Sequence, residues 1–148
     1  MSLKEKINSD LKDAMKSGDK IRLSTVRSIR ALILDFEKSG AGRDLTPVEE
    51  VAMLTRAAKK RRDSIEQYKK AGRNDLVEQE EKELAILAEY LPKQLSNEEL
   101  EAEVKKLADD IGATSKSDFP KLMPLAVKTL NGKADGKRIK EAVDKLLS

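Results

Sequence analysis

The sequence contains no cysteine, no histidine and no tryptophan. Without cysteine, the chain has no disulfide, thiolate nucleophile or zinc–thiolate site. Without histidine, it lacks the side chain that most often acts as a general base near neutral pH. Aromatic residues make up only 3% of the chain and are scattered along it, so a platform that stacks several single-stranded bases is not expected. We therefore predict no catalytic residues, no metal and no cofactor.

Long apolar runs are also missing. No stretch approaches the ~20 apolar residues that a transmembrane helix needs. The N-terminal residues Met1–Glu5 lack the apolar core of a signal peptide. These absences predict a soluble, cytoplasmic protein with no membrane partner.

Charged residues are abundant, at 39% of the chain, but the two signs nearly balance. The 30 basic residues exceed the 27 acidic ones by a net charge of only +3. Attraction of the whole molecule to nucleic acid would therefore be weak, and local clusters of cations matter more. The apolar residues, another 39%, are mostly aliphatic and recur at helical spacing, so disorder is not expected.

The apolar spacing of three and four residues, with no strand-like alternation, predicts an all-α protein. Helix starts are well marked. Thr46 and Glu49 have the spacing of a capping box with Pro47 between them, and Ser96 and Glu99 repeat the box. The predicted helices cover residues 2–17, 19–39, 46–71, 74–90, 96–111, 117–130 and 136–147.

Proline divides this pattern. Pro92 breaks the chain between the fourth and fifth helices, which predicts a larger N-terminal four-helix domain, 1–91, and a small three-helix C-terminal domain, 92–148. Pro120 suits a first helical turn, whereas Pro124 does not suit a helix interior. We therefore expect the sixth helix to begin irregularly and to become regular only after Pro124.

The turn Gly132–Arg138 is the first candidate site. Its glycines permit backbone angles closed to other residues, and the first amides of the next helix have no intrahelical partner. With Lys133, Lys137 and Arg138 nearby, these features favour an anion, most simply a phosphate gripped bidentately by the arginine. The alternative is a glycine C-cap and an aspartate N-cap among solvated lysines. The candidate tRNA- or anion-binding residues are Lys128, Gly132, Lys133, Gly136, Lys137, Arg138 and Lys140.

The third predicted helix carries a second basic patch, Lys59, Lys60 and Arg62. A basic helix face of this kind can follow a phosphate backbone. The alternative is a helical hairpin in which acidic side chains of the fourth helix neutralise the third. Arg61 lies within the apolar stripe, so we expect a buried stem with a carboxylate partner, which is a structural role.

Five sequence blocks resemble the YqeY-like proteins of the GatB/YqeY family over essentially the whole chain. They are Asp10–Lys16, Arg22–Arg27, Arg61–Tyr68, Tyr90–Ser96 and Gly132–Lys137, of which the last two are the most specific. The resemblance implies an all-helical, two-domain bacterial protein of poorly defined role. It also implies that the C-terminal domain is similar to the tail of the GatB component of the tRNA-dependent amidotransferases, which contacts tRNA away from the chemistry. The chain departs from the family pattern at Pro120 and Pro124.

The leading hypothesis is a non-catalytic, tRNA-associated module that recognises folded RNA by its shape and phosphates. The expected partner is tRNA or a protein of tRNA metabolism. One alternative is a protein-interaction adaptor. Another is an accessory to a carbon–nitrogen ligase that uses glutamine as amido donor, which would need a partner protein to supply the catalytic groups.

Overall fold

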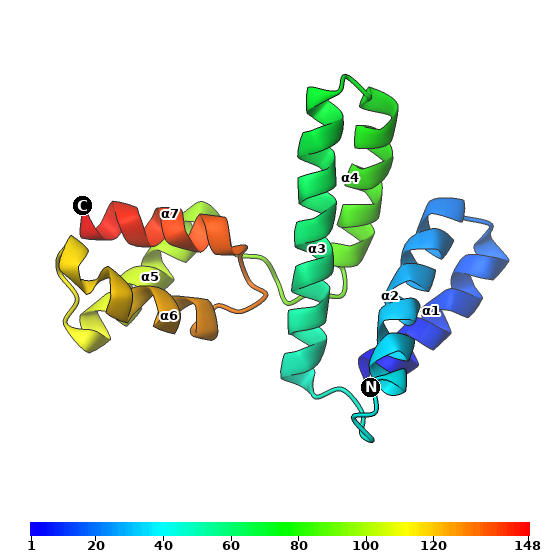
Figure 1. The fold of residues 1–148 in the computed structure, drawn as a ribbon, viewed down its shortest axis with the longest axis horizontal. Helices are drawn as coiled ribbons and strands as arrows, with labels where there is room; N and C mark the ends of the chain where they lie inside the picture. Colours follow the sequence, from blue (N-terminus) through cyan, green and yellow to red (C-terminus); the bar gives the residue numbers. More distant parts are fainter. The chain divides into compact units, whose positions relative to one another are not determined.

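The computed structural model describes all 148 residues. It contains seven α-helices, a single 3₁₀ turn and no strand, so the predicted all-α class is confirmed (Figure 1). The chain divides into two compact units, Met1–Leu91 and Pro92–Ser148. Each unit has its own buried apolar cluster, so each is described by itself.

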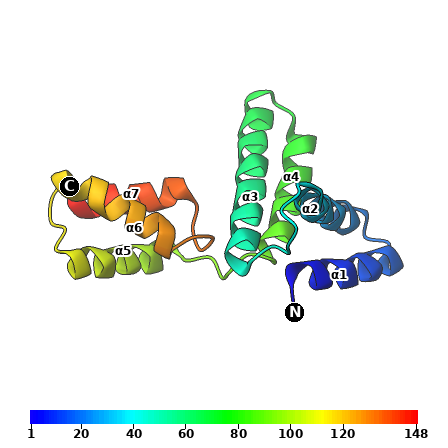
Figure 2. The same ribbon diagram turned by 60° about the horizontal axis from the view of Figure 1, so that its bottom comes forward.

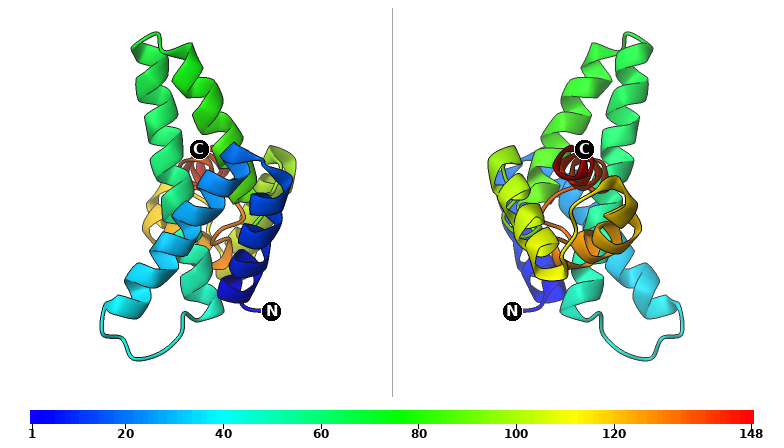
Figure 3. Two further views of the ribbon diagram at one scale, coloured as in Figure 1. Left: turned by 90° about the vertical axis from the view of Figure 1, so that its right-hand side faces the viewer. Right: turned by 90° about the vertical axis from the view of Figure 1, so that its left-hand side faces the viewer.

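The first unit begins with two helices, α1 (Leu3–Ser17) and α2 (Lys20–Lys38). Gly18 ends α1 with a φ of 75°, a left-handed conformation that glycine adopts without a steric penalty. Asp19 then caps α2, because its carboxylate accepts a hydrogen bond from the backbone N–H of Arg22 at 3.0 Å. The two helices lie side by side in the left view of Figure 3.

Helices α3 (Pro47–Lys70) and α4 (Asn74–Ala88) form a long hairpin (Figure 1). The predicted capping box is present at the start of α3. The hydroxyl of Thr46 accepts from the N–H of Glu49, and the Glu49 carboxylate accepts from the N–H of Thr46. Apolar side chains from all four helices form the buried cluster of this unit: Leu3, Ile7, Val26, Ile29, Ile33, Met53, Leu54, Ala58 and Leu87.

The second unit is a three-helix bundle of α5 (Asn97–Ile111), α6 (Phe119–Thr129) and α7 (Gly136–Leu147). Helix α7 packs on both α5 and α6 (Figure 2), and the right view of Figure 3 looks almost along it. Its core is aliphatic and consists of Leu100, Val104, Ala108, Leu122, Ala126, Leu130, Ala134, Ile139, Ala142, Val143 and Leu147.

The start of α6 differs from the prediction. The irregular segment is a 3₁₀ turn, η1 (Lys116–Asp118), and α6 is helical from Phe119 onward, so it is regular before Pro124 and not only after it. Pro124 cannot donate to the carbonyl of Pro120, which therefore lacks its intrahelical bond. Both prolines are exposed, so this carbonyl lies on the solvent side of the helix, where water can satisfy it.

Candidate anion-binding site

The turn between α6 and α7 uses only one of its glycines for conformational freedom. Gly132 is buried and has a φ of 78°. Gly136 is the first residue of α7 and is not among the residues with positive φ, and a Cβ added there would meet nothing within 4 Å. The expectation that both glycines are needed for the backbone path is therefore wrong for Gly136.

The backbone of this turn is fixed by the segment that precedes α5. The N–H of Leu95 donates to the carbonyl of Lys133 at 2.8 Å. The side-chain amide of Gln94 donates to the carbonyl of Gly132 at 2.6 Å. Ala134 is 5% exposed and packs in the core of the unit. The turn is thus held from both sides, which gives the lysines around it a rigid base.

The start of α7 is already occupied by a carboxylate. Asp135 is the N-cap, and its Oδ1 accepts from the N–H of Arg138 at 2.8 Å. The expectation that the first amides of α7 are unpaired is therefore wrong for this amide. The aspartate also places a negative charge where the helix dipole would attract an anion. Local geometry follows the alternative in which an aspartate caps the helix.

Arg138 fastens α7 to the segment before α5. Its Nη2 donates to the carbonyl of Leu95 at 2.6 Å and to Oδ1 of Asn97 at 2.9 Å, and its Nε reaches the same Oδ1 at 3.2 Å. Only Nη1 of the guanidinium makes no bond within the chain. A phosphate can approach that nitrogen alone without breaking structural bonds, so the bidentate grip predicted for Arg138 stays a prediction.

The lysines of the site are in a different state from Arg138. Lys133 precedes α7, Lys137 and Lys140 lie three residues apart on its first turns, and Lys128 lies at the end of α6. All four are exposed, and their ammonium groups make no hydrogen bond or ion pair with the chain. They are therefore available to an anion without loss of an internal contact.

The second patch is partly neutralised, as its alternative predicts for the hairpin. Nη1 of Arg61 bonds to Glu83 at 2.6 Å and to Glu80 at 3.3 Å, and its Nη2 donates to the hydroxyl of Ser28 at 3.1 Å. The structural role predicted for Arg61 is confirmed. Farther along the hairpin, Lys69 lies 3.9 Å from Glu81.

The three residues of the second patch lie on α3 in the first unit. Lys59 and Lys60 are exposed and make no ion pair, whereas Arg62 is half-buried and has a partner within the chain. The two sets of candidate residues therefore belong to different units of the chain. Whether either binds an anion stays a prediction.

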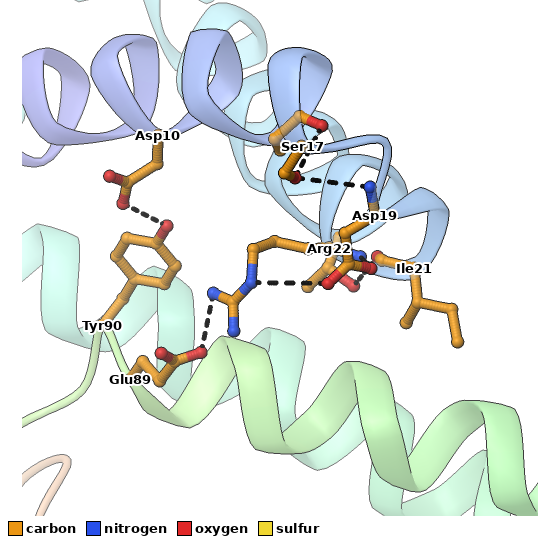
Figure 4. A network of polar contacts seen from close by, with 9 residues as sticks. Asp10, Ser17, Asp19, Ile21, Arg22, Glu89 and Tyr90 are labelled. Carbon is orange, nitrogen blue, oxygen red and sulfur yellow. Dashed lines mark hydrogen bonds and ion pairs between the residues drawn. The ribbon is translucent and has the colours of Figure 1, made fainter.

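Sequence reasoning missed a polar network at the end of α4 (Figure 4). The Tyr90 hydroxyl donates to Asp10 on α1, and Nη1 of Arg22 on α2 donates to Glu89 at 2.9 Å. Burial, followed by the Asp10 carboxylate, raises the pKa of Tyr90, so its phenol stays protonated. The network ties α4 to α1 and α2. Its only signal in the sequence was that Asp10, Arg22 and Tyr90 each begin one of the family-like blocks.

The structure offers no metal centre and no membrane span. No group of histidine, cysteine, aspartate and glutamate side chains is arranged to hold a metal ion. None of the helices combines the length and the apolar composition that crossing a bilayer requires.

Comparison with known proteins adds the family. The model of the family described as Yqey-like protein matches residues 4–147. Altered inheritance of mitochondria protein 41 of Lachancea thermotolerans is 33% identical over 113 residues, which is 75% of this chain and 60% of the relative. The protein of the same name in Kluyveromyces lactis is 31% identical over 136 residues, or 90% of this chain and 69% of the relative. An uncharacterized Schizosaccharomyces pombe protein is 33% identical over 96 residues, 65% of this chain and 77% of its own length.

These relatives correct two expectations. The prediction of a cytoplasmic location is wrong, because the fungal relatives are named as mitochondrial proteins. The expectation of a specifically bacterial protein is also wrong, because the matched relatives are eukaryotic. The alignment with the Lachancea thermotolerans relative spans 60% of that relative's length, so that protein has further sequence outside the alignment.

Proposed function

Because the chain belongs to the YqeY-like family, whose model covers residues 4–147, we propose that it is a non-catalytic, tRNA-associated protein. Its C-terminal unit contacts the phosphates of folded RNA through exposed lysines. The observation that carries this proposal is the state of Lys128, Lys133, Lys137 and Lys140. These four ammonium groups surround a rigid turn and have no partner within the chain.

Lysines, and not the helix end, supply the attraction in this proposal. Asp135 caps α7 and opposes an anion at the helix axis, and Arg138 is bonded to Leu95 and Asn97. An unpaired lysine has no internal bond to break, so each phosphate that it neutralises releases counterions at little structural cost. Lys137 and Lys140, three residues apart, lie on one face of α7 and can reach neighbouring phosphates. Recognition of this type reads the shape of the RNA and its backbone.

The exposed Lys59 and Lys60, with Arg62 beside them, provide a second RNA contact in this proposal. The acidic side chains of α4 lower its contribution, because Glu78 and Glu81 are exposed on the neighbouring helix. We expect it to be the weaker of the two surfaces.

The test is a salt titration of tRNA binding, from about 50 to 200 mM salt, with the full chain. We expect affinity to fall steeply with salt. The double variant Lys133→Ala/Lys137→Ala should bind more weakly and lose about 1 from the slope of log K against log salt for each phosphate contact removed. The matched control is Lys105→Ala/Lys106→Ala, which removes two exposed, unpaired lysines of α5.

No binding at low salt would overturn the proposal, and so would equal losses in the two double variants. Two tRNA pools should be compared, one cytosolic and one mitochondrial, because the relatives' names connect the family with mitochondria. A stoichiometric protein partner recovered in place of RNA would favour the adaptor alternative. Release of ammonia from glutamine by the isolated chain would contradict the non-catalytic part of the proposal.

A further inference from the structure

The second unit contains an open cleft of about 530 Å³ that lies apart from the α7 turn. It is found where η1 and the start of α6 meet the C-terminal half of α7. Its lining residues are Lys116, Phe119, Lys140, Asp144, Leu147 and Ser148. Pockets of about 300–1,000 Å³ accept small organic ligands, so the volume suits one nucleotide-sized molecule.

The floor of the cleft is apolar and rests on the core of the unit. Leu147 is 4% exposed and belongs to the buried cluster, and Phe119 is half-buried and packs against that cluster. The phenyl ring is thus held in place by the core while it still lines the cleft. A fixed aromatic ring is the side chain on which a single unstacked base can lie.

The rim of the cleft carries charges that nothing in the chain neutralises. Lys140 and Asp144 are four residues apart on α7, a spacing at which opposite charges often pair, yet they form no ion pair. The ammonium of Lys116 on η1 is likewise without a partner. The cleft therefore presents two cations and one hydrogen-bond acceptor around an apolar floor.

We propose that this cleft binds one unpaired nucleotide of an RNA. Lys116 and Lys140 hold its phosphate, the base lies on Phe119, and the carboxylate of Asp144 accepts hydrogen bonds from the edge of the base. The inference rests on the proposed function, since Lys140 belongs both to the lysine ring at the α7 turn and to the cleft. It adds a contact to the base itself to a surface that otherwise meets only phosphates.

The carboxylate of Asp144 makes the site selective among bases. An ionised carboxylate only accepts hydrogen bonds, so it favours an edge that carries donors. Guanine offers a ring N–H and an amino group side by side, which matches both carboxylate oxygens. Adenine and cytosine offer an amino group alone, and uracil offers a single ring N–H between two carbonyls. We therefore expect guanine to bind most tightly and uracil least.

The experiment titrates the ¹⁵N-labelled full chain with GMP, UMP or inorganic phosphate and follows backbone amide shifts. GMP should give saturable shifts at Phe119, Lys140 and Asp144, and UMP should bind several-fold more weakly. Inorganic phosphate should shift only the surroundings of Lys116 and Lys140. Absence of saturable GMP shifts would overturn the proposal, and equal affinities for GMP and UMP would overturn the role of Asp144.

Two variants separate the contacts. Asp144→Asn changes an exposed side chain without a partner, so it should keep the fold and abolish the preference for GMP over UMP. Phe119→Leu keeps an apolar floor but removes the stacking surface, so it should weaken both nucleotides about fivefold or more. Lys105→Ala, on α5 and outside the cleft, should change neither affinity.

The cleft and the lysine ring can fail separately. tRNA binding that depends on Lys133 and Lys137, with no GMP shifts, would leave the proposed function intact and overturn the cleft. GMP binding with the expected base preference, but with no tRNA binding at low salt, would support the cleft and overturn the lysine ring as an RNA contact.

Discussion

At the scale of single residues, Arg61 shows how a charge is accommodated in an apolar helix face. Its side chain is only 17% exposed and its main partner Glu83 only 8%, and the two are joined at 2.6 Å. The hydroxyl of Ser28 on α2 accepts a further hydrogen bond from the same guanidinium. The position of Arg61 in the apolar stripe predicted a buried pair, but the identity of its partners depends on how α2, α3 and α4 come together.

Removal of Glu83 should be costly. Glu83→Ala leaves a largely buried guanidinium without its closest carboxylate, so we expect a loss of about 3 kcal/mol in the free energy of unfolding. The control is Glu78→Ala, which removes the exposed partner of Lys82 on the same helix and should cost less than about 1 kcal/mol. Urea denaturation of both variants checks this. Similar losses in the two would show that Glu83 does not stabilise the hairpin through Arg61.

Glu49 links the start of α3 to acid stability. Arg43 donates to both carboxylate oxygens, at 2.6 and 3.0 Å, and the N–H of Thr46 donates at 3.0 Å. Together, with Arg43 as the larger cause, these donors lower the pKa of Glu49 from 4.5 to about 2. Since the folded pKa lies below the unfolded one, the stabilisation is present above pH 4.5 and is lost as the pH falls toward 2.

We therefore expect Glu49→Gln to be less stable than the natural chain at neutral pH, with a difference that shrinks between pH 4.5 and about 2. Thermal unfolding across this pH range measures the difference. An NMR titration of the Glu49 carboxyl carbon measures its pKa directly, and Arg43→Ala should move that pKa back upward. A difference that stays constant down to pH 2 would contradict this assignment.

At the scale of helices, local signals were enough to place most boundaries. The capping boxes at Thr46 and Ser96 and the glycine at position 18 act within a few residues, so the sequence alone displays them. The anchoring of the candidate site was hidden from sequence reasoning. Arg138 bonds to Asn97, 41 positions earlier, and such a contact exists only after the bundle has formed. The sequence therefore predicted cations at this turn but not which of them the fold already uses.

Helix α6 allows a direct test of its two prolines. Pro124→Ala restores a donor for the carbonyl of Pro120, so it should stabilise the second unit by about 1–3 kcal/mol. Pro120→Ala is the control, because Pro120 lies in the first turn, where its missing N–H has no intrahelical partner. It should change stability by less than about 1 kcal/mol. Chemical denaturation followed by circular dichroism compares them. A destabilised Pro124→Ala variant would mean that the proline is required for the path of α6.

At the scale of the whole molecule, the second unit contains everything that its core needs. Its buried cluster draws only on residues of α5 to α7 and the turn between α6 and α7. The bonds from Gln94 and Leu95 to the α7 turn also lie within Pro92–Ser148. A domain of this size buries a small fraction of its surface, so each of these bonds is a large part of its net stability.

We expect the fragment Pro92–Ser148 to fold alone, with a helical circular dichroism spectrum and a cooperative thermal transition. A shorter fragment that begins at Asn97 keeps all three helices but lacks the donors Gln94 and Leu95 and the Leu95 carbonyl that accepts from Arg138. It should melt at a clearly lower temperature, by roughly 4–8 °C per kcal/mol lost. Equal melting temperatures would show that these contacts do not stabilise the bundle.

The anchoring of the α7 turn has a consequence for chemical modification. Arginine, glutamine and main-chain groups hold the turn, whereas the four lysines around it hold nothing. Acetylation of those ε-amino groups would therefore remove positive charge one step at a time without loosening the bundle. Affinity for a polyanion would be graded by the number of acetyl groups, while the protein beneath remained folded and abundant.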